Sequence, residues 1–251
     1  MMNPMSLKNR KIFITGASSG IGKATAIYCA NLGAQVVLHG RNIERLEKTK
    51  KQLSGNNHII CVQDFNTNTD WENIFNDIIC DGIKLDGLVH CAGVPCIMPI
   101  KSLTKERLSN VMNINFYSFV ELARFFVKRK YSNDYSSIVG ISSSAVLHPR
   151  MYELGYLASK AAMEISIPVM AQEFSKRNIR VNCVSPGSVM TEMISSTLNE
   201  HNNKDVLDYV TSQSIMGWQE PEEIAKVCSF LLSNESKAIT AKIIRADGGI
   251  F

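Results

Sequence analysis

The segment 11–32 joins a short apolar run, a glycine-rich turn and a helical pattern. Residues 11–15 are mostly apolar and end at Gly16, which is typical of a buried parallel strand. Gly20 and Gly22 continue the turn into the helical pattern. Small residues let a backbone approach a phosphate closely, and the start of a helix offers unpaired N–H groups and a positive dipole end. The segment therefore predicts a nucleotide-phosphate site, although a plain tight turn is the alternative because the glycine spacing is GxxxGxG.

Strand-like runs alternate with helical patterns along the sequence. The strand-like runs cover residues 11–15, 34–40, 58–62, 85–91, 137–142, 179–185 and 242–246. The helical patterns cover residues 21–32, 42–53, 70–80, 104–130, 155–177 and 222–232. This alternation predicts an α/β fold in which one doubly wound parallel sheet has helices on both faces and binds ligands where the strand order reverses. With 251 residues, we expect one domain that spans the chain.

Composition and charge exclude several classes of protein. The chain is 45% hydrophobic and 20% charged, as globular proteins are, and its net charge of +4 is too mild to indicate a nucleic-acid partner. The seven cysteines show no CxxC or Cys/His spacing, so we expect reduced thiols, a cytoplasmic location and no metal site. No run is long and apolar enough to predict a membrane span, and the first ten residues lack the apolar core of a signal peptide.

Tyr156 and Lys160 form a pattern that indicates acid/base chemistry. Residues four apart share one face of a helix, and of the seven tyrosines only Tyr156 has a lysine four positions later. A positive charge beside a phenol favours the phenolate, so we expect Lys160 to lower the pKa of Tyr156 from its usual value of about 10. The spacing alone also arises by chance on solvated helices, and its context is what gives it weight.

Four separated motifs supply that context in a fixed order. They are TGASSGIG at 15–22, Asn115, Ser143 followed by Tyr156-Leu157-Ala158-Ser159-Lys160, and Pro186-Gly187. With these motifs the chain resembles the short-chain dehydrogenase/reductases from about residue 7 to residue 251, and among them the 3-oxoacyl-[acyl-carrier-protein] reductases and their broad-specificity relatives. The resemblance implies a Rossmann-type fold and an NAD(P)-dependent oxidoreductase that acts on a small carbonyl or alcohol.

The resemblance also implies a catalytic group made of Asn115, Ser143, Tyr156 and Lys160. Ser143 and Tyr156 would bind the substrate oxygen, Tyr156 would move its proton, and Lys160 would lower the tyrosine pKa and hold the nicotinamide ribose. Asn115 would distort the long helix locally and anchor a water molecule. Asn113 competes for that role, and Asn115 is preferred because a bulky apolar residue follows it. Ser143 is selected from a run of three serines by its spacing to Tyr156.

Cofactor contacts are implied in the same way. Asp64 and Phe65 follow the third strand, where the family binds adenine, and the segment 186–191 matches the one that holds the nicotinamide carboxamide. His90 and Cys91 stand where the family has two asparagines, which leaves the local hydrogen bonding open, and we expect His90 to be a core or strand-end residue. The full set of implied contacts is Gly16, Ser18, Ser19, Gly20, Ile21, Arg41, Asp64, Phe65, Cys91, Ala92, Gly93, Tyr156, Lys160, Pro186, Gly187, Val189 and Thr191.

The end of the second strand bears on which nicotinamide cofactor is used. An acidic residue there would accept from the ribose 2′-OH, whereas an arginine accommodates a 2′-phosphate. The chain has Gly40 at the position of the acidic residue, followed by Arg41, so we expect NADP(H), with NAD(H) possible. Ser19 replaces the second basic residue of the stronger NADP(H) pattern, and Arg41 by itself is also what a solvated loop would carry.

The leading interpretation is an NADP(H)-dependent reductase that converts a carbonyl to an alcohol. The alternatives are an alcohol dehydrogenase of the same fold that runs oxidatively and a non-catalytic nucleotide-binding sensor or scaffold. The polar segment 190–217 matches a substrate lid of the family. The resemblance implies a tetramer, because family members of this size usually form tetramers. The helices at 104–130 and 155–177 carry more apolar residues than one sheet needs, which also predicts a homotetramer, although burial of both helices within one subunit is the alternative. These residues are Phe116, Phe119, Phe125, Phe126, Val127, Ile165, Ile167, Val169 and Met170.

Overall fold

A computed structural model describes residues 3–192 and 214–250. Within these residues, seven parallel strands form one sheet in the order β3-β2-β1-β4-β5-β6-β7. The order reverses between β1 and β4, so the doubly wound parallel sheet that the sequence predicted is confirmed. The strands are β1 (Lys11–Thr15), β2 (Gln35–Gly40), β3 (Ile59–Val62), β4 (Leu85–His90), β5 (Ser132–Ile141), β6 (Arg180–Pro186) and β7 (Lys242–Ala246).

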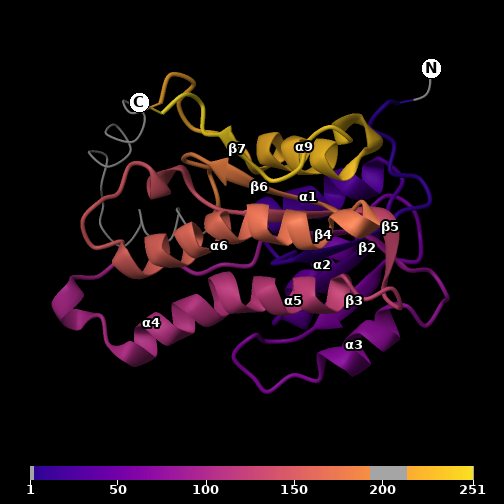
Figure 1. The fold of residues 1–251 in the computed structure, drawn as a ribbon, viewed down its shortest axis with the longest axis horizontal. Helices are drawn as coiled ribbons and strands as arrows, with labels where there is room; N and C mark the ends of the chain where they lie inside the picture. Colours follow the sequence, from indigo (N-terminus) through magenta and orange to yellow (C-terminus); the bar gives the residue numbers. More distant parts are fainter. Residues whose placement is uncertain (1–2, 193–213, 251) are drawn as a thin grey trace.

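Helices cover both faces of the sheet (Figure 1). On one face the apolar core includes Phe13 and side chains of α3, α5 and α6, and on the other it includes Ile12 and side chains of α1, α2 and α9. Alternating residues of β1 thus enter opposite cores, as the pleat of a strand requires. The α-helices are α1 (Gly20–Asn31), α2 (Ile43–Lys50), α3 (Trp71–Ile78), α4 (Lys105–Met112), α5 (Ser118–Phe126), α6 (Leu154–Glu173) and α9 (Pro221–Leu232).

Side-chain caps fix where several of these helices begin. Asn42, Asp70 and Thr104 each accept a hydrogen bond from a backbone N–H in the first turn of α2, α3 and α4. Before α9, the Glu223 side chain accepts from the backbone N–H of Glu220 as part of a capping box. Such caps satisfy N–H groups that the helix itself leaves unpaired.

The long helix predicted for 104–130 is interrupted. A single π-helical turn, η2 (Asn113–Tyr117), separates α4 from α5, and the two helices continue one another beside α6 (Figure 1). A π-turn accommodates one extra residue in an α-helix and is frequent at functional sites. Asn115 lies in this turn and is fully buried.

Strand β5 begins at Ser132, five residues before the start at 137 that the sequence indicated. The added residues are polar, so hydrophobic periodicity does not reveal them. They pair with β4 through a register shift: Leu85 faces Ser132, but Gly87 faces Ser137. The first part of this strand is therefore a bulged segment that continues into the buried part.

Some of the apolar side chains from which subunit contacts were predicted are buried in the core, and others are exposed. Phe119, Phe125, Phe126, Ile167 and Met170 belong to the core of the chain itself, so for these residues the interpretation as interface residues is wrong. Ile165 and Val169 on α6 are 72% and 52% exposed. These two side chains remain unpacked among the described residues and are available for contact with another molecule.

The carboxyl ends of β1, β2, β4, β5 and β6 lie at one edge of the sheet, where the glycine-rich turn begins α1. Most of the segment expected to form a lid, 190–217, lies outside the described residues. No helix in the described part is both long enough and apolar enough to cross a membrane.

Candidate active site

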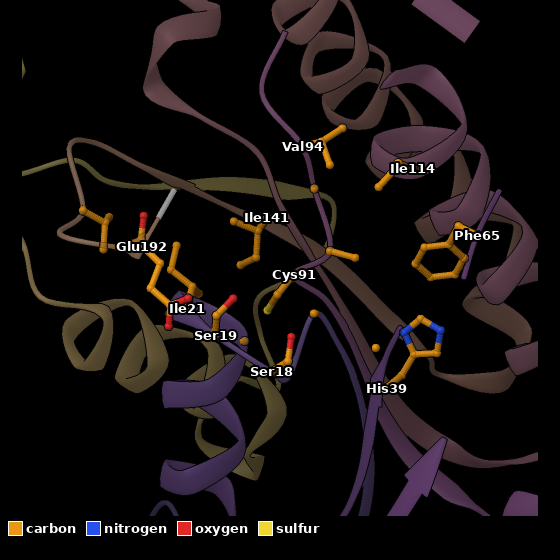
Figure 2. Close-up of a pocket in the computed structure, with 18 of the residues that line it drawn as sticks. Ser18, Ser19, Ile21, His39, Phe65, Cys91, Val94, Ile114, Ile141 and Glu192 are labelled. Carbon is orange, nitrogen blue, oxygen red and sulfur yellow. The ribbon is translucent and has the colours of Figure 1, made fainter. Parts of the chain in front are cut away.

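A cavity of about 330 Å³ lies at this edge of the sheet, and all the residues implied as cofactor contacts line it. Figure 2 shows part of this lining, including Ser18, Phe65 and Cys91. The glycine-rich turn forms one wall, and the ends of β2 and β3 contribute Arg41 and Asp64. Ser143, Tyr156 and Lys160 line the same cavity. The fold therefore brings the expected cofactor residues and three of the expected catalytic residues into one continuous space.

The glycine-rich turn approaches β4 so closely that side chains are excluded. Gly16 has φ +64°, and a Cβ on it would lie 2.9 Å from the backbone nitrogen of Ala92. A Cβ on Gly22 would lie 2.3 Å from the carbonyl oxygen of Gly16. The Thr15 hydroxyl accepts a hydrogen bond from the Ala92 N–H at 3.0 Å and fixes this contact. Only glycine fits at these two positions.

The start of α1 differs from the capped starts of α2, α3 and α4. Its N-cap residue, Ser19, makes no side-chain cap hydrogen bond, and the first turn carries no acidic residue. The N–H groups of this turn face the cavity without a side-chain acceptor among the described residues. Unpaired N–H groups and the positive end of the helix dipole bind phosphate at such a position. The uncapped first turn of α1 therefore fits a pyrophosphate.

Two arginines border the cavity near the end of β2. Arg41 makes no hydrogen bond or ion pair with any described residue, whereas Arg45 forms an ion pair with Glu192 across the mouth of the cavity. Sequence reasoning missed Arg45, although a basic residue four positions after Arg41, near the start of a helix, was a usable signal. Each arginine is a fixed positive charge that can pair with a phosphate.

Ser143 and Tyr156 face one another across the end of β5 and the start of α6. The Ser143 backbone is extended, and its Oγ accepts from the Ala145 N–H at 3.3 Å. A hydrogen bond to Ser143 lowers the pKa of Tyr156, but the burial of the phenol outweighs it and raises the pKa to about 12. The expectation that this pKa is lowered is therefore wrong, because removal of the phenolate from water costs more than the hydrogen bond returns.

Lys160 lies beside the tyrosine ring without reaching its hydroxyl. Its Nζ is 5.7 Å from the centroid of the Tyr156 ring and donates to the carbonyl oxygen of Ile141 at 2.6 Å. Burial lowers the pKa of the lysine to about 8, so the ammonium form still predominates at neutral pH. The lysine is thus a buried cation at the cavity wall, held by the end of β5.

Asn115 connects three segments behind the cavity. Its Oδ1 accepts from the Val94 N–H at 2.8 Å, and its Nδ2 donates to the Val94 carbonyl at 3.1 Å and to Ser159 Oγ at 2.9 Å. A Cβ on Gly93 would lie 3.5 Å from both Asn115 Oδ1 and Lys160 Nζ. Asn115 does not line the cavity itself, but it fixes the loop after β4 against the helix that carries Tyr156 and Lys160.

The competing residues form other hydrogen bonds. Asn113 donates to the carbonyl of Phe65 at 2.7 Å and to Asn66 Oδ1 at 3.0 Å, so it stabilises the loop after β3. Ser142 also lines the cavity, but its hydroxyl donates to Glu164 Oε1 at 2.7 Å. Of the serine run, Ser143 is the residue hydrogen-bonded to Tyr156.

Comparison with known proteins identifies the family. The family model described as "Enoyl-(Acyl carrier protein) reductase" matches residues 16–250. The chain belongs to the short-chain dehydrogenase/reductase family. It is 31% identical to glucose 1-dehydrogenase of Gluconobacter oxydans, with 96% of this chain and 91% of that protein covered. It is 30% identical to 3-oxoacyl-[acyl-carrier-protein] reductase of Thermotoga maritima, with 98% and 99% covered.

Solved structures agree with this family assignment. The structure of a 3-oxoacyl (acyl-carrier-protein) reductase from Agrobacterium tumefaciens C58 with NADP bound matches with a TM-score of 0.87 and 26% identity. The match covers 98% of this chain and 96% of that one. As a member of the short-chain dehydrogenase/reductase family, the chain is an NAD(P)-dependent oxidoreductase with a small-molecule substrate.

His90 shows how the chain satisfies a position where the short-chain dehydrogenase/reductase motif has asparagine. Its Nδ1 lies 3.1 Å from Thr15 Oγ1, and its Nε2 lies 3.3 Å from Ser118 Oγ. The Ser118 hydroxyl donates to the carbonyl of Ile114, so Nε2 is the nitrogen that carries the proton, and Nδ1 accepts from Thr15. Burial lowers the pKa of His90 to about 3. The histidine is therefore a neutral, fully paired core residue that ties β1 and β4 to α5.

Residues outside the implied set of cofactor contacts and the predicted catalytic group also line the cavity. They are Gly22, His39, Gly40, Arg45, Gln63, Val94, Ile114, Ile141, Ser142 and Glu192.

Proposed function

We propose that this short-chain dehydrogenase/reductase is an NADPH-dependent reductase that converts a carbonyl to an alcohol, with Tyr156 as the proton donor. The observation that carries the proposal is the single cavity that joins the uncapped glycine-rich turn and Arg41 to Ser143, Tyr156 and Lys160. When bound, the cofactor supplies the hydride. The described residues then have to bind it, orient the carbonyl and deliver a proton.

Binding and orientation follow from the two ends of the cavity. The turn from Gly16 to Gly22 would hold the pyrophosphate, and Arg41 would pair with the 2′-phosphate, since no described residue occupies its guanidinium. Asp64 would accept from the adenine amino group, and the segment 186–191 would hold the carboxamide. Lys160 lies where its ammonium would bind the nicotinamide ribose.

The protonation state of Tyr156 supports its role as the proton donor. A pKa raised to about 12 keeps the phenol protonated at neutral pH, and a carbonyl that is being reduced needs a proton donor. Ser143 would bind the carbonyl oxygen, and the nearby Lys160 cation would stabilise the phenolate that remains after proton transfer.

Substrate screening tests the proposal directly. NADPH consumption should be measured over ketones, diketones, acyl thioesters and keto-sugars, with NADP⁺ reduction by the matching alcohols at the same pH. Turnover of a carbonyl that exceeds the reverse rate supports a reductase. Oxidation alone would favour the alcohol dehydrogenase, and binding of nucleotide without any turnover would favour a sensor or scaffold.

We also infer the setting in which this enzyme works. Ile165 and Val169, exposed on α6, support a homotetramer in which this helix packs against another subunit. The cysteines of the described residues are unpaired thiols, and most are buried, which supports a cytoplasmic enzyme. The chain would act as one nucleotide-binding domain of residues 1–251, with a substrate lid at about 190–217.

A further inference from the structure

His39 is a buried imidazole whose hydrogen bonds are missing. It is 2% exposed, and neither Nδ1 nor Nε2 has a hydrogen-bond partner among the described residues. Two other buried histidines are fully paired. His58 accepts from the Val36 N–H at 3.1 Å and contacts the Ser54 carbonyl at 3.1 Å, and His90 bonds two hydroxyls. A buried polar group without a partner destabilises the fold, so each such group calls for an explanation.

The ring lies at the cavity wall. His39 is the second last residue of β2, two positions before Arg41, and it lines the cavity together with Asp64 and Phe65. Its carbonyl accepts from the Ala17 N–H at 3.0 Å, which fixes the strand end against the glycine-rich turn. Figure 2 shows the imidazole beside the ring of Phe65, on the side of the cavity away from Glu192.

Aromatic rings surround the rest of the imidazole. Its centroid lies 4.6 Å from that of Phe65, with the two planes tilted by 31°, and 6.0 Å from that of Trp71. The third neighbour, Phe13, meets it edge-on at 5.8 Å. None of these rings forms a hydrogen bond with the imidazole. Phe65 is half-buried at the cavity surface, so a turn of its ring is the movement that would open the imidazole to a ligand.

The charge state limits which ligand fits. Burial lowers the pKa of His39 to about 3, an effect that Asp64 only partly offsets, so the ring is neutral at physiological pH. A neutral imidazole presents one N–H donor and one acceptor nitrogen. A purine edge presents ring-nitrogen acceptors beside an amino donor, and its flat face suits the neighbouring phenyl ring of Phe65.

We propose that His39 hydrogen-bonds to the adenine of the nicotinamide cofactor and is a positioning residue for the adenosine half. The inference rests on the proposed function, which places that cofactor in this cavity. NADPH and NADH share the adenine, so His39 sets the affinity for both without setting the preference between them. The preference for NADPH over NADH would be set by Arg41.

Titration calorimetry of the His39→Phe variant tests the contact, with NADPH, NADH and ADP-ribose as probes. The phenyl ring keeps the packing but cannot form hydrogen bonds, so the affinity should fall about tenfold for all three probes. The NADPH:NADH affinity ratio should stay unchanged. In the absence of nucleotide the melting temperature should stay the same or rise, because the unpaired polar atoms are gone.

Two further variants separate the contact from a structural effect. His58→Phe removes a paired buried imidazole far from the cavity, so it should lower the melting temperature and leave all three affinities unchanged. His39→Gln keeps a donor and an acceptor, so it should retain most of the affinity that His39→Phe loses. If His39→Phe does not fold, His39→Leu provides the same comparison.

The outcomes distinguish this inference from the proposed function. Unchanged affinity of the folded His39→Phe variant for all three probes overturns the inference, and so does a loss confined to NADPH, which would place the contact at the 2′-phosphate. If the unaltered protein binds none of the three probes, the proposed function fails as well. An equal loss for all three probes, with stability retained, supports the contact with adenine.

Discussion

Lys160 holds its ammonium group 5.7 Å from the centre of the Tyr156 ring, while its hydrogen bond goes to the carbonyl of Ile141. The position of the cation is therefore fixed by the end of β5 and not by a bond to the tyrosine hydroxyl. Burial keeps the phenol protonated, and the neighbouring ammonium group would stabilise a phenolate formed there.

Tyr156→Phe should remove proton donation and little else. We expect turnover to fall by roughly 10² or more, because one positioned acid contributes about that factor. The affinity for NADPH and the melting temperature should change little. Stopped-flow reduction of an active carbonyl measures the rate, and Tyr135→Phe, which alters a tyrosine that is 73% exposed, is the matched control. A Tyr156→Phe variant with most of its activity would rule out the proposed role.

Arg41→Asp should shift the enzyme toward NADH. The loss of a charge-assisted hydrogen bond costs about 1.5 to 3 kcal/mol, and repulsion of the 2′-phosphate adds to this cost. We therefore expect the NADPH:NADH ratio of kcat/KM to fall by at least about tenfold. Lys51→Asp makes the same change of charge at the far end of α2 and should not alter the ratio. An unchanged ratio in Arg41→Asp would contradict the role of Arg41.

Glu192→Gln should strengthen NADPH binding. Glu192 pairs with Arg45 at the mouth of the cavity, and its removal leaves Arg45 available to the 2′-phosphate. The pair is exposed, and such pairs contribute about 0 to 1 kcal/mol, so the gain in affinity should be no more than about fivefold. NADH should bind as before. Calorimetry with both cofactors measures the difference, and weaker NADPH binding would show that the carboxylate assists the cofactor.

Acid should destabilise the protein through its buried histidines. Burial lowers the pKa of His39 to about 3 in the folded protein, whereas the pKa of a histidine in an unfolded chain is about 6.5. The unfolded state therefore binds more protons than the folded state between these two pH values. The contribution of the neutral His39 to the free energy of unfolding is fully present above the unfolded-state pKa and is lost as the pH falls below it. Between pH 7 and pH 5, the free energy of unfolding of His39→Phe should therefore fall by about 2 kcal/mol less than that of the unaltered protein. Urea unfolding at both pH values measures this, and equal losses would contradict the burial of a neutral ring.

Ile165→Lys should weaken subunit association. The side chain is 72% exposed on α6, and a charge there would have to be buried in an interface at a cost of several kcal/mol. Light scattering at micromolar concentration should report four chains for the unaltered protein and a smaller species for the variant. Lys176→Glu, in the η4 turn (Ser175–Arg177), changes the charge outside this face and serves as the control. A monomeric unaltered protein would refute the tetramer.

The sequence was sufficient for features that depend on local spacing. The run from the apolar strand through Gly16 and Gly22 predicted the close turn that the structure has, because close backbone approach needs glycine at fixed positions. The four-residue step from Tyr156 to Lys160 placed both side chains on one helix face. The positions of the motifs also predicted a set of cofactor contacts, and all of these residues line the cavity.

Features that depend on burial and on distant loops could not be predicted in this way. The pKa of Tyr156 is raised because the surrounding chain excludes water, and spacing carries no information on solvation. Arg45 and His39 line the cavity because β2 ends beside the glycine-rich turn, a contact made in three dimensions. The first residues of β5, which begins at Ser132, are polar and include a bulge, so their hydrophobic pattern does not alternate as that of a strand does.

The π-turn at 113–117 makes the number of residues in this helix part of the architecture of the candidate site. Each residue of a regular α-helix advances the chain by about 100° of rotation. Deletion of one residue from the turn would let α4 and α5 merge into an uninterrupted helix, and the remaining residues of the former turn would take new positions around the helix axis. Asn115 would then leave Val94 and Ser159, even though every side chain of the catalytic group were still encoded. A shortened gene could thus abolish the activity while preserving every motif by which the protein would be recognised.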